Sequence, residues 1–432
     1  MTLLIKPNPL REKNNTNIFY NVDWITVLLY LVLITMGWMN IYAAVYNEEH
    51  YIITDISQKY GKQMLWIATA LILALIILII DENFYTAFAY FIFGAFLVAN
   101  ILVPFLGREV KGSRSWFRFG DFGMQPAEFM KFATNLALAK FLSNQEVKIS
   151  NYKNTIIALT FLLVPMFIIK VLQDETGLAI VFVAFIFSLY REGLSVNYLL
   201  LGFLAIVLFI LALLINNLYL LIFIAALCLI AVLFVKRNAK NLFTIAVIGI
   251  IACTMVTGTS HVYDKMELHQ KVRIDVLLGR GTVNLKKEGY NVNQAKIAIG
   301  SGGFWGKGYL QGTQTKYDFV PEQDTDFIFC TVGEEWGFVG STIVIILLLS
   351  LIIRVLFMAE RQRSSFSRIY GYGVASVLFF HLMVNVGMTI GLAPVIGIPL
   401  PFFSYGGSSL WSFTILLFIF IKLDSHRFEI MR

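Results

Sequence analysis

The sequence is poor in charged residues. Only 14% of its 432 residues are Asp, Glu, Lys or Arg, whereas soluble domains contain about 25%. The hydrophobic residues, 58% of the chain, form repeated runs of about 20, the length that a membrane-spanning helix needs. Because these runs are continuous rather than alternating, they exclude a closed β-barrel. The composition therefore excludes a soluble globular protein and predicts a single integral membrane domain over residues 1–432.

Cysteine and nucleotide-binding motifs are also scarce. The three cysteines, Cys228, Cys253 and Cys330, lie in or beside apolar runs, at spacings that match neither a disulfide framework nor a metal site. The sequence contains no P-loop, no HExxH motif and no dinucleotide fingerprint after a strand. The first 23 residues are polar and precede a full-length apolar run, so we expect no cleavable signal peptide.

The apolar runs predict an all-α, polytopic membrane protein with twelve spanning helices. The expected spans are 24–46, 62–80, 84–106, 126–142, 154–172, 176–190, 198–215, 218–235, 241–258, 326–356, 369–392 and 404–422. The spans at 126–142 and 176–190 are the weak or short ones. A polar connection at 259–325 separates two spans, and connections of that length within compact proteins are usually functional.

Lysine and arginine predict the sidedness of these helices. With both termini inside, the inner segments carry 17 Lys and Arg, and the outer segments carry 6 once the long connection is left out. Long loops are left out because they are translocated largely regardless of their charge. We therefore expect cytoplasmic termini and external loops at 107–125 and 259–325. Half of the 34 Lys and Arg residues lie in these inner segments, so the net charge of +7 reflects membrane sidedness and does not indicate a nucleic-acid partner.

The external loop 107–125 contains four basic residues, although short outer loops normally avoid them. They are Arg108, Lys111, Arg114 and Arg118. One interpretation is a solvated loop with local acidic partners. The other is an outward-facing anion site, because the planar guanidinium of arginine can bind two phosphate oxygens. Trp116 lies in the same loop, and an anchoring role at the membrane surface is an alternative to a functional one.

Charged residues inside the expected spans are candidate functional groups, because each costs roughly 2.5–3.5 kcal/mol to insert. Glu128 and Lys131 lie three residues apart, so they can pair on one helix face. That pair is explained either by function or by a structural role between helices. Lys170 lies near a helix end with Asp174 four residues on, and snorkelling with a local ion pair accounts for it.

Two acids lie where the apolar span 326–356 begins: Asp324 just before it and Asp326 at its first position. The helix dipole favours an acid at either position, so position alone does not choose between them. Glu334 and Glu335 follow about two turns later, near a glycine-rich bend, where a structural role is an alternative. Outward-facing acids near basic groups in a membrane indicate an anionic amphiphile as substrate and acid–base chemistry.

Seven stretches resemble, in order, the motifs of the SEDS family of peptidoglycan glycosyltransferases, the RodA/FtsW proteins. They are GSRSWF (112–117), QPAEFMK (125–131), IAIGSGGFWGKG (297–308), QGTQT (311–315), DTDFIF (324–329), GEEWGFVG (333–340) and NVGMTIGLAPVIGIPLPFFSYGGSS (385–409). QGTQT is more similar to the RodA, cell-elongation branch than to the FtsW, division branch. The resemblance implies a polymerase of lipid II, the undecaprenyl-diphosphate-linked disaccharide-peptide. It would act at the outer face of the bacterial cytoplasmic membrane and release undecaprenyl diphosphate.

The resemblance also implies which residues form the site. The family's essential acid falls on Asp326, which would act as the general base of an inverting glycosyl transfer. The substrate-binding positions fall on Arg114, Trp116, Glu128, Lys131, Glu175, Ser404 and Ser408. The charge of the leaving diphosphate would be met by Arg114, Lys131 or a divalent cation, Mg²⁺ or Mn²⁺. The usual family residue at position 324 is His, so we expect Asp324 to be dispensable.

Two features depart from the family pattern. Where the family commonly has Gln-Pro-Asp-x-Gly, residues 173–177 read Gln-Asp-Glu-Thr-Gly. Counting from Gly177, the acid becomes Glu175, and Asp174 stays open as the alternative. The family fold has ten helices, so we expect an added helical hairpin at 198–235, whose role the sequence does not indicate.

The family resemblance implies a partner and leaves a rival function. The implied partner is a single-span class B penicillin-binding transpeptidase, together with other proteins of the elongation complex. The rival is a lipid II flippase, which intramembrane charges and many helices would suit equally well. A flippase needs polar groups through the depth of the membrane. The expected spans 24–46 and 62–80 have none at mid-depth, which favours the enzyme.

Overall fold

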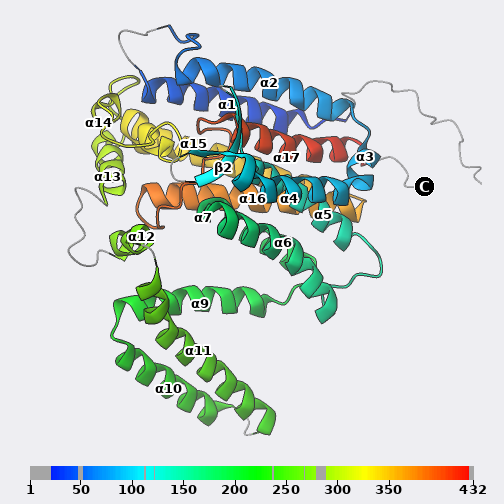
Figure 1. Cartoon of the computed structure of the whole chain (residues 1–432), viewed down its shortest axis with the longest axis vertical. Coiled ribbons are helices and arrows are strands. Elements are labelled where there is room, and N and C mark those ends of the chain that lie inside the picture. The colour runs from blue at the N-terminus through cyan, green and yellow to red at the C-terminus, as the bar shows by residue number, and fades with distance from the viewer. Residues whose placement is uncertain are drawn as a thin grey trace, which may run out of the picture.

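The computed structural model describes residues 21–46, 52–110, 113–120, 122–235, 238–266, 268–278 and 289–427. Its helices are α1 (Trp24–Ala44), α2 (Lys59–Ile79), α3 (Glu82–Ala87), α4 (Ala89–Leu106), α5 (Pro126–Leu142), α6 (Tyr152–Gln173), α7 (Thr176–Val181), η2 (Phe182–Ala184), α8 (Phe185–Arg191), α9 (Val196–Leu214), α10 (Asn217–Phe234), α11 (Ala239–Lys265), α12 (Leu268–Leu278), α13 (Tyr290–Gly302), α14 (Thr313–Lys316), α15 (Ile328–Glu360), α16 (Ser365–Thr389) and α17 (Gly407–Ser425). The strands are β1 (Arg108–Val110), β2 (Ser113–Phe119) and β3 (Phe122–Met124). The chain is thus the expected all-α polytopic membrane protein, with one small sheet added (Figure 1).

Ten of the described helices are long and apolar enough to cross a membrane. They are α1, α2, α4, α6, α9, α10, α11, α15, α16 and α17. The two weak spans of the sequence analysis differ from these. The expected span 126–142 is the 17-residue α5, which is buried along nearly its whole length and carries Glu128 and Lys131. The expected span 176–190 is a shorter apolar helix, Thr176–Arg191, in which α7, η2 and α8 follow one another without a gap and η2 is a turn of 3-10 helix.

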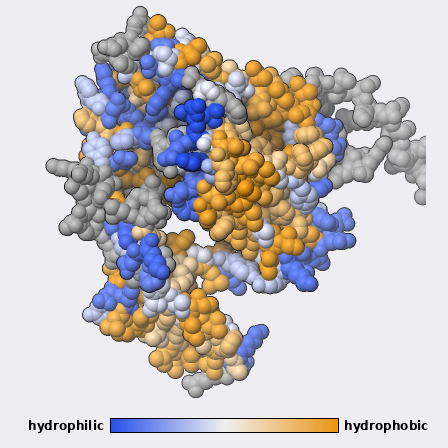
Figure 2. Space-filling model, viewed as in Figure 1, coloured by the Kyte–Doolittle hydropathy of each residue, from blue (hydrophilic) through white to orange (hydrophobic). Residues whose placement is uncertain are grey.

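The centre of the protein is formed by α5, α16 and α17, the helices that are most enclosed by others. Small residues allow this close packing. Gly371 of α16 lies against the ring of Phe420 in α17, and Gly373 lies against the side chain of Asn135 in α5. A methyl group at either glycine would collide with its neighbour. Hydrophobic side chains cover the outer flanks of the helices (Figure 2), as contact with lipid requires.

The expected loop 107–125 is in fact a three-stranded antiparallel sheet in the order β1-β2-β3. Arg108 faces Trp116 across the first pair of strands, and Phe117 faces Met124 across the second. Gly120, with φ +64°, makes the turn between β2 and β3, where a residue with a side chain would be strained. The sheet rests on α4 and α5. The sheet was not expected from the sequence, because β1 and β3 have three residues each and the seven residues of β2, SRSWFRF, do not alternate between polar and apolar.

The long connection 259–325 is also largely folded rather than a plain loop. It contains the end of α11, and then α12, α13 and α14. α13 packs along the first turns of α15 because Gly302 and Gly333 bring the two backbones together. Residues 267 and 279–288 of this connection lie outside the described residues.

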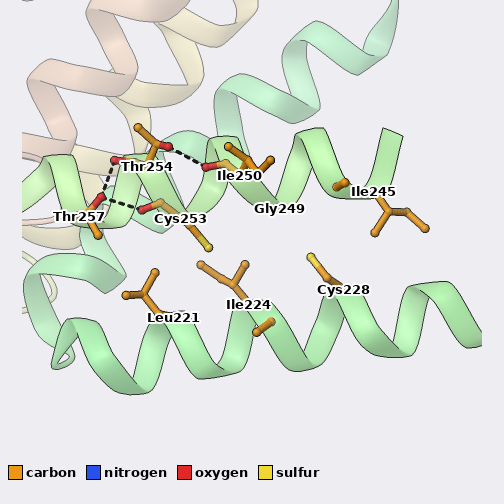
Figure 3. A pocket seen from close by; sticks show the side chains of 11 residues that line it. Leu221, Ile224, Cys228, Ile245, Gly249, Ile250, Cys253, Thr254 and Thr257 are labelled. Carbon is orange, nitrogen blue, oxygen red and sulfur yellow. Dashed lines mark hydrogen bonds between the residues drawn. The ribbon is translucent and has the colours of Figure 1, made fainter. Parts of the chain in front are cut away.

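The helices α9, α10 and α11 form a separate group below the main body in Figure 1, and it is called the three-helix unit here. Its core consists of its own residues, Ala212, Leu220, Ile224, Ala252 and Val256. Both α9 and α10 pack mainly on α11 rather than on each other. Residues 198–235, which were expected to form a hairpin, therefore supply two of the three helices of this unit. An apolar groove runs between α10 and α11, where the hydroxyls of Thr254 and Thr257 donate to backbone carbonyls of their own helix (Figure 3). That α9 and α10 are additions to the family fold stays a prediction.

A buried ion network joins α1, α15 and α17 at the N-terminal end of α1. Asp23, the N-cap of α1, accepts from Arg354 at 2.6 Å and from Arg361 at 3.1 Å. Arg361 also donates to Asp424 of α17. Burial alone would raise the pKa of Asp23, but hydrogen bonds from Arg354 and Thr26 outweigh it and lower that pKa from 3.8 to about 2.

Candidate functional site

Asp326 lies in a turn directly before α15, with its side chain half-buried. The side-chain amide of Asn385, in α16, donates to the backbone carbonyl of Asp326 at 2.9 Å and to that of Ile398 at 2.8 Å. The Asp326 carboxylate lies against Gly397, where a side chain would come within 3.1 Å of Oδ2. Asn385 and Gly397 therefore fix both the backbone and the carboxylate of Asp326 beside the 396–399 segment.

Gln323 holds the same turn from the other side. Its side-chain amide lies 2.7 Å from the carbonyl of Ala44, the last residue of α1, and 2.8 Å from the carbonyl of Thr315. Because Asp23 marks the start of α1 and Gln323 contacts its end, the ion network and the Asp326 turn lie at opposite ends of that helix. A helix of 21 residues separates them by about 30 Å.

Asp324 is buried, and its carboxylate is paired with Lys59 of α2 at 2.8 Å. Its backbone carbonyl accepts from the N–H of Tyr405 at 2.9 Å. The family resemblance predicts that Asp324 is dispensable, because the family usually has His at this position. The structure instead gives this acid two contacts that tie the Asp326 turn to α2 and to the 400–406 loop.

Glu128 and Lys131 do pair on one face of α5, as their spacing predicted. Lys131 Nζ lies 2.6 Å from Glu128 Oε2 and 3.3 Å from His381 Nε2, and it lies over the ring of Phe413. Both charged side chains are buried. His381 Nδ1 is 3.0 Å from the carbonyl oxygen of Pro399. The buried pair is thus connected through one histidine to the segment that borders Asp326.

The sequence left open whether Glu175 or Asp174 is the acid of the site, and the two side chains have different surroundings. Glu175 accepts a hydrogen bond from Ser115 of β2 at 2.8 Å. Asp174 is exposed, has φ +53° and pairs with Lys170, as expected from their spacing. The geometry therefore directs Glu175 toward the other candidate residues and leaves Asp174 in a local surface pair.

The segment 396–399 is where these groups meet. Gly177, two residues after Glu175, packs against the carbonyl oxygen of Ile396 so closely that no side chain would fit. Asp326 contacts the next residue, Gly397, and His381 contacts Pro399. The segment thus brings the Glu175 turn, the candidate base and the buried Glu128–Lys131 pair into one neighbourhood.

Arg114 and Trp116 lie on the face of β2 opposite to Ser115, because side chains alternate along a strand. Arg114 is 61% exposed and makes only a loose ion pair with Glu109 of β1, at 3.5 Å. Trp116 is half-buried against Gly123 of β3. The structure therefore separates these two residues from the Glu175 contact, on a face that is open to an external ligand.

Ser404 and Ser408 are buried, and their hydroxyls bond to protein groups. Ser404 accepts from the N–H of Leu400 at 2.8 Å, which closes the turn before α17. Ser408 accepts from the N–H of Gln125 and donates to the carbonyl of Gly123, both at 3.2 Å. These contacts position the loops around the site, and substrate binding by the two hydroxyls stays a prediction.

Glu334 has the structural role that the sequence analysis kept open. It is fully buried and accepts from Lys307 Nζ at 2.7 Å and from the N–H groups of Thr313, Gln314 and Thr315 at 2.8–2.9 Å. The carboxylate caps α14 and holds the QGTQT motif against α15. Gly337, with φ +62°, then bends α15 just beyond this contact.

Several positioning residues were missed by the sequence analysis. They are Lys59, Ser115, Gln323, His381 and Asn385. Of these, only Ser115, Gln323 and Asn385 lie in or next to a family motif. That proximity was the only sequence feature that could have indicated a role for them. Lys59 and His381 become visible only when distant helices meet.

Among the described residues, no three His, Cys, Asp or Glu side chains gather into a site that could hold a metal ion. Glu128 is paired with Lys131, and Glu175 accepts from Ser115. These residues do not fit a resident, all-protein metal centre. They fit at most a cation that arrives with substrate phosphates, as Mg²⁺ commonly does.

Comparisons with known proteins agree with this architecture. The profile of the cell cycle protein family that comprises FtsW, RodA and SpoVE matches residues 23–221 and 198–429. The chain is 32% identical to the peptidoglycan glycosyltransferase RodA of Treponema pallidum, with 94% of this chain and 98% of that protein covered. It is 30% identical to the peptidoglycan glycosyltransferase MrdB of Escherichia coli K12, with 94% of both covered.

Solved structures show the same fold. The rod shape determining protein RodA of Thermus thermophilus has a TM-score of 0.62 at 23% identity, with 95% of this chain and 98% of that chain covered. A chain from a peptidoglycan synthase complex, described as coordinating polymerization and crosslinking, has a TM-score of 0.69 at 23% identity, with 95% and 99% covered. At these identities the likeness concerns the fold alone.

Proposed function

Because the chain belongs to the FtsW/RodA/SpoVE family, we propose that it polymerises lipid II into glycan strands during cell elongation and releases undecaprenyl diphosphate. It is a peptidoglycan glycosyltransferase and a multi-pass membrane protein. The observation that carries the proposed chemistry is Asp326: a half-buried carboxylate on a turn that is fixed by Gln323, Asp324 and Asn385. A general base needs such a fixed position, because proton transfer depends on geometry before pKa.

In the proposed reaction, Asp326 accepts the proton of the acceptor sugar hydroxyl. The hydroxyl oxygen then attacks the anomeric carbon of the donor sugar, and the bond between that carbon and the diphosphate oxygen breaks. The electron pair leaves with undecaprenyl diphosphate, and the anomeric configuration is inverted. The product is one glycosidic bond and a protonated Asp326, which returns its proton to solvent.

The developing charge on the diphosphate needs cationic partners. We assign Arg114 to this role at the exposed face of β2, with Trp116 bordering the sugar or lipid. Glu128 and Lys131 support the site from the interior, through His381 and the 396–399 segment. Ser404 and Ser408 complete the proposed substrate-binding set by shaping the loops that border it.

A divalent cation, Mg²⁺ or Mn²⁺, stays part of the proposal only as an ion that is carried by the substrate diphosphate. When bound, it would neutralise the leaving group, and Glu175, which accepts a hydrogen bond from Ser115, would help to hold it. Polymerisation after chelation, and after readdition of each ion, tests this. Full activity in excess chelator would remove the cation from the proposal.

The central experiment uses purified protein, fluorescent lipid II and gel separation of the glycan products. Wild-type protein should make long strands, whereas Asp326→Asn, which cannot accept a proton as a base, should lose about 10²–10⁴-fold in rate. Far-ultraviolet circular dichroism and size exclusion would check that the variant is folded. A folded Asp326→Asn protein with the wild-type rate would contradict the base assignment. The rival flippase would instead move lipid II across vesicles without forming polymer.

We place the protein in the bacterial cytoplasmic membrane, with Asp326 on the external side. The support is the charge asymmetry of the loops, together with the location of Asp326 at the opposite end of α1 from Asp23. A cysteine-free variant with Asn293→Cys should react with an impermeant thiol reagent in intact spheroplasts, and Gln145→Cys should react only after lysis. The reverse pattern would overturn this orientation.

The proposed partner is a single-span class B penicillin-binding transpeptidase, which cross-links the strands as they form, within a larger set of elongation proteins. The support is the similarity in fold to a chain from a complex that couples polymerization with crosslinking. Reconstitution with and without the cognate transpeptidase tests this. Polymerisation that is undiminished by its loss, both in cells and when purified, would argue against an activating partner.

A further inference from the structure

We propose that Lys59 is a positioning residue for Asp326, and that it acts through its ion pair with Asp324. This inference rests on the proposed function, because it takes Asp326 as the base. Nothing in the motifs points to Lys59, which lies at the first position of α2, more than 260 residues away in the sequence. Only the folded chain brings it to the Asp326 turn.

The ion pair is asymmetric in exposure. Lys59 Nζ lies 2.8 Å from Asp324 Oδ2, with the lysine side chain 50% exposed and the aspartate side chain 6% exposed. A buried carboxylate needs a partner, because an unpaired charge away from water is strongly unfavourable. Lys59 therefore decides where the side chain of Asp324 can lie. Since only Thr325 separates the two acids, a displaced Asp324 would displace Asp326 as well.

α2 also holds the loop on the other side of Asp324. Gln63, one turn after Lys59, accepts from the N–H of Gly406 at 3.2 Å. The neighbouring Tyr405 N–H donates to the carbonyl of Asp324 at 2.9 Å. The first two turns of α2 thus clamp both the Asp326 turn and the 404–407 loop. A movement of α2 would change the relation between the base and the loop that precedes α17.

The geometry distinguishes positioning from direct substrate binding. Asp324 is too buried to meet a substrate, so its loss can act only through the turn. If Lys59 acts through Asp324, loss of either partner removes the same constraint. The two substitutions should then lower kcat to a similar degree, leave KM for lipid II unchanged and be non-additive when combined.

The experiment measures kcat and KM for fluorescent lipid II with purified Lys59→Met, Asp324→Asn and the double variant. Small displacements of a catalytic group can cost up to about 10²-fold, and we expect each single variant to lose about tenfold in kcat. Lys59→Arg, which keeps the charge, should recover most of the wild-type rate. The double variant should be no slower than the slower single variant.

A matched control removes a similar ion pair away from the site. Arg368→Met breaks the 3.0 Å pair with Glu192, whose side chains are 32% and 13% exposed, and it should leave kcat unchanged. An unchanged kcat for folded Lys59→Met would overturn the inference, as would a raised KM with unchanged kcat, since that would mean direct substrate contact. Absence of polymer with wild-type protein would contradict the proposed function instead.

Discussion

Asn385 donates its side-chain amide to the backbone carbonyl of Asp326 at 2.9 Å, and through the same nitrogen to the carbonyl of Ile398 at 2.8 Å. One buried amide on α16 thereby couples the turn that carries the candidate base to the segment that contacts Glu175's turn and His381. The position of Asp326 is set by the interior of the bundle rather than by the loop alone.

Asn385→Ala should lower both stability and activity. It leaves two carbonyl groups without a donor, and an unsatisfied buried polar group costs about 1–3 kcal/mol. We expect a lower Tm in detergent and a fall in kcat of about ten- to a hundredfold. Asn293→Ala, an exposed substitution on α13, is the control and should change neither. A wild-type kcat for folded Asn385→Ala would show that the turn holds its place without this amide.

Glu175 and Asp174 should separate in function. Glu175→Gln keeps the acceptor for Ser115 but removes the charge, and we expect it to lower polymerisation by at least about tenfold, the effect of losing one charged contact of about 1.5 kcal/mol. Asp174→Asn removes only the partner of Lys170 at an exposed position, where ion pairs contribute little. Rates at limiting and saturating lipid II provide the measurement. Equal losses for the two variants would contradict the assignment.

The Glu128–Lys131 pair should be strongly non-additive in stability. Removing one partner leaves a buried charge unpaired, which costs about 3–5 kcal/mol, whereas replacing both by apolar residues is often close to neutral. We therefore expect Glu128→Gln and Lys131→Met to lower Tm sharply, and the double variant to recover part of that loss. Activity should not recover, because the charges also support the site. A double variant that polymerises normally would leave the pair with a structural role only.

The ion network at Asp23 predicts a pH dependence of stability. Because the folded pKa of Asp23 is depressed to about 2, its contribution is present above about pH 4 and is lost as the pH falls through about 2. Asp23→Asn should therefore destabilise the protein at pH 7 by about 1–2 kcal/mol, allowing for screening at the partly exposed arginines. Thermal unfolding of both proteins from pH 7 down to pH 2 is the test. A constant difference across that range would exclude the ion pair as its cause.

Most of the fold could be predicted from the sequence, because long apolar runs form few structures other than membrane-spanning or buried helices. Eleven expected spans correspond to single helices or to a helix with a short leading turn, and the Glu128–Lys131 and Lys170–Asp174 pairs follow from helical spacing. The expected span 176–190 is also a continuous apolar helix, Thr176–Arg191, which tightens to 3-10 geometry at η2. The sheet at 107–125 was missed because β1 and β3 have only three residues each and the seven residues of β2, SRSWFRF, do not alternate between polar and apolar.

The candidate site was predictable only in part. Motif resemblance identified Asp326, Glu128, Lys131 and Glu175, which the fold brings to one segment. It gave no indication that Asp324 is anchored by Lys59, because that pairing depends on how α2 packs against the turn. Residue spacing also could not show that Arg114 lies on one face of β2 while Glu175 contacts the opposite face through Ser115. These contacts join residues that are far apart in the sequence. They depend on how the helices pack together, and a local sequence pattern does not specify that packing.

The three-helix unit has a consequence for how the chain can change over evolutionary time. Its helices pack on one another through their own core, and many of their outward side chains are apolar and exposed, as expected for positions that face lipid. Substitutions there are filtered mainly by hydrophobicity and helix length, whereas those around α5, α16 and α17 must respect shape, charge and glycine positions together. The unit is thus the part of the chain in which substitutions can create new lateral contacts with little effect on the proposed catalytic residues. A fluorescent tag or affinity handle placed within it should leave polymerase activity intact.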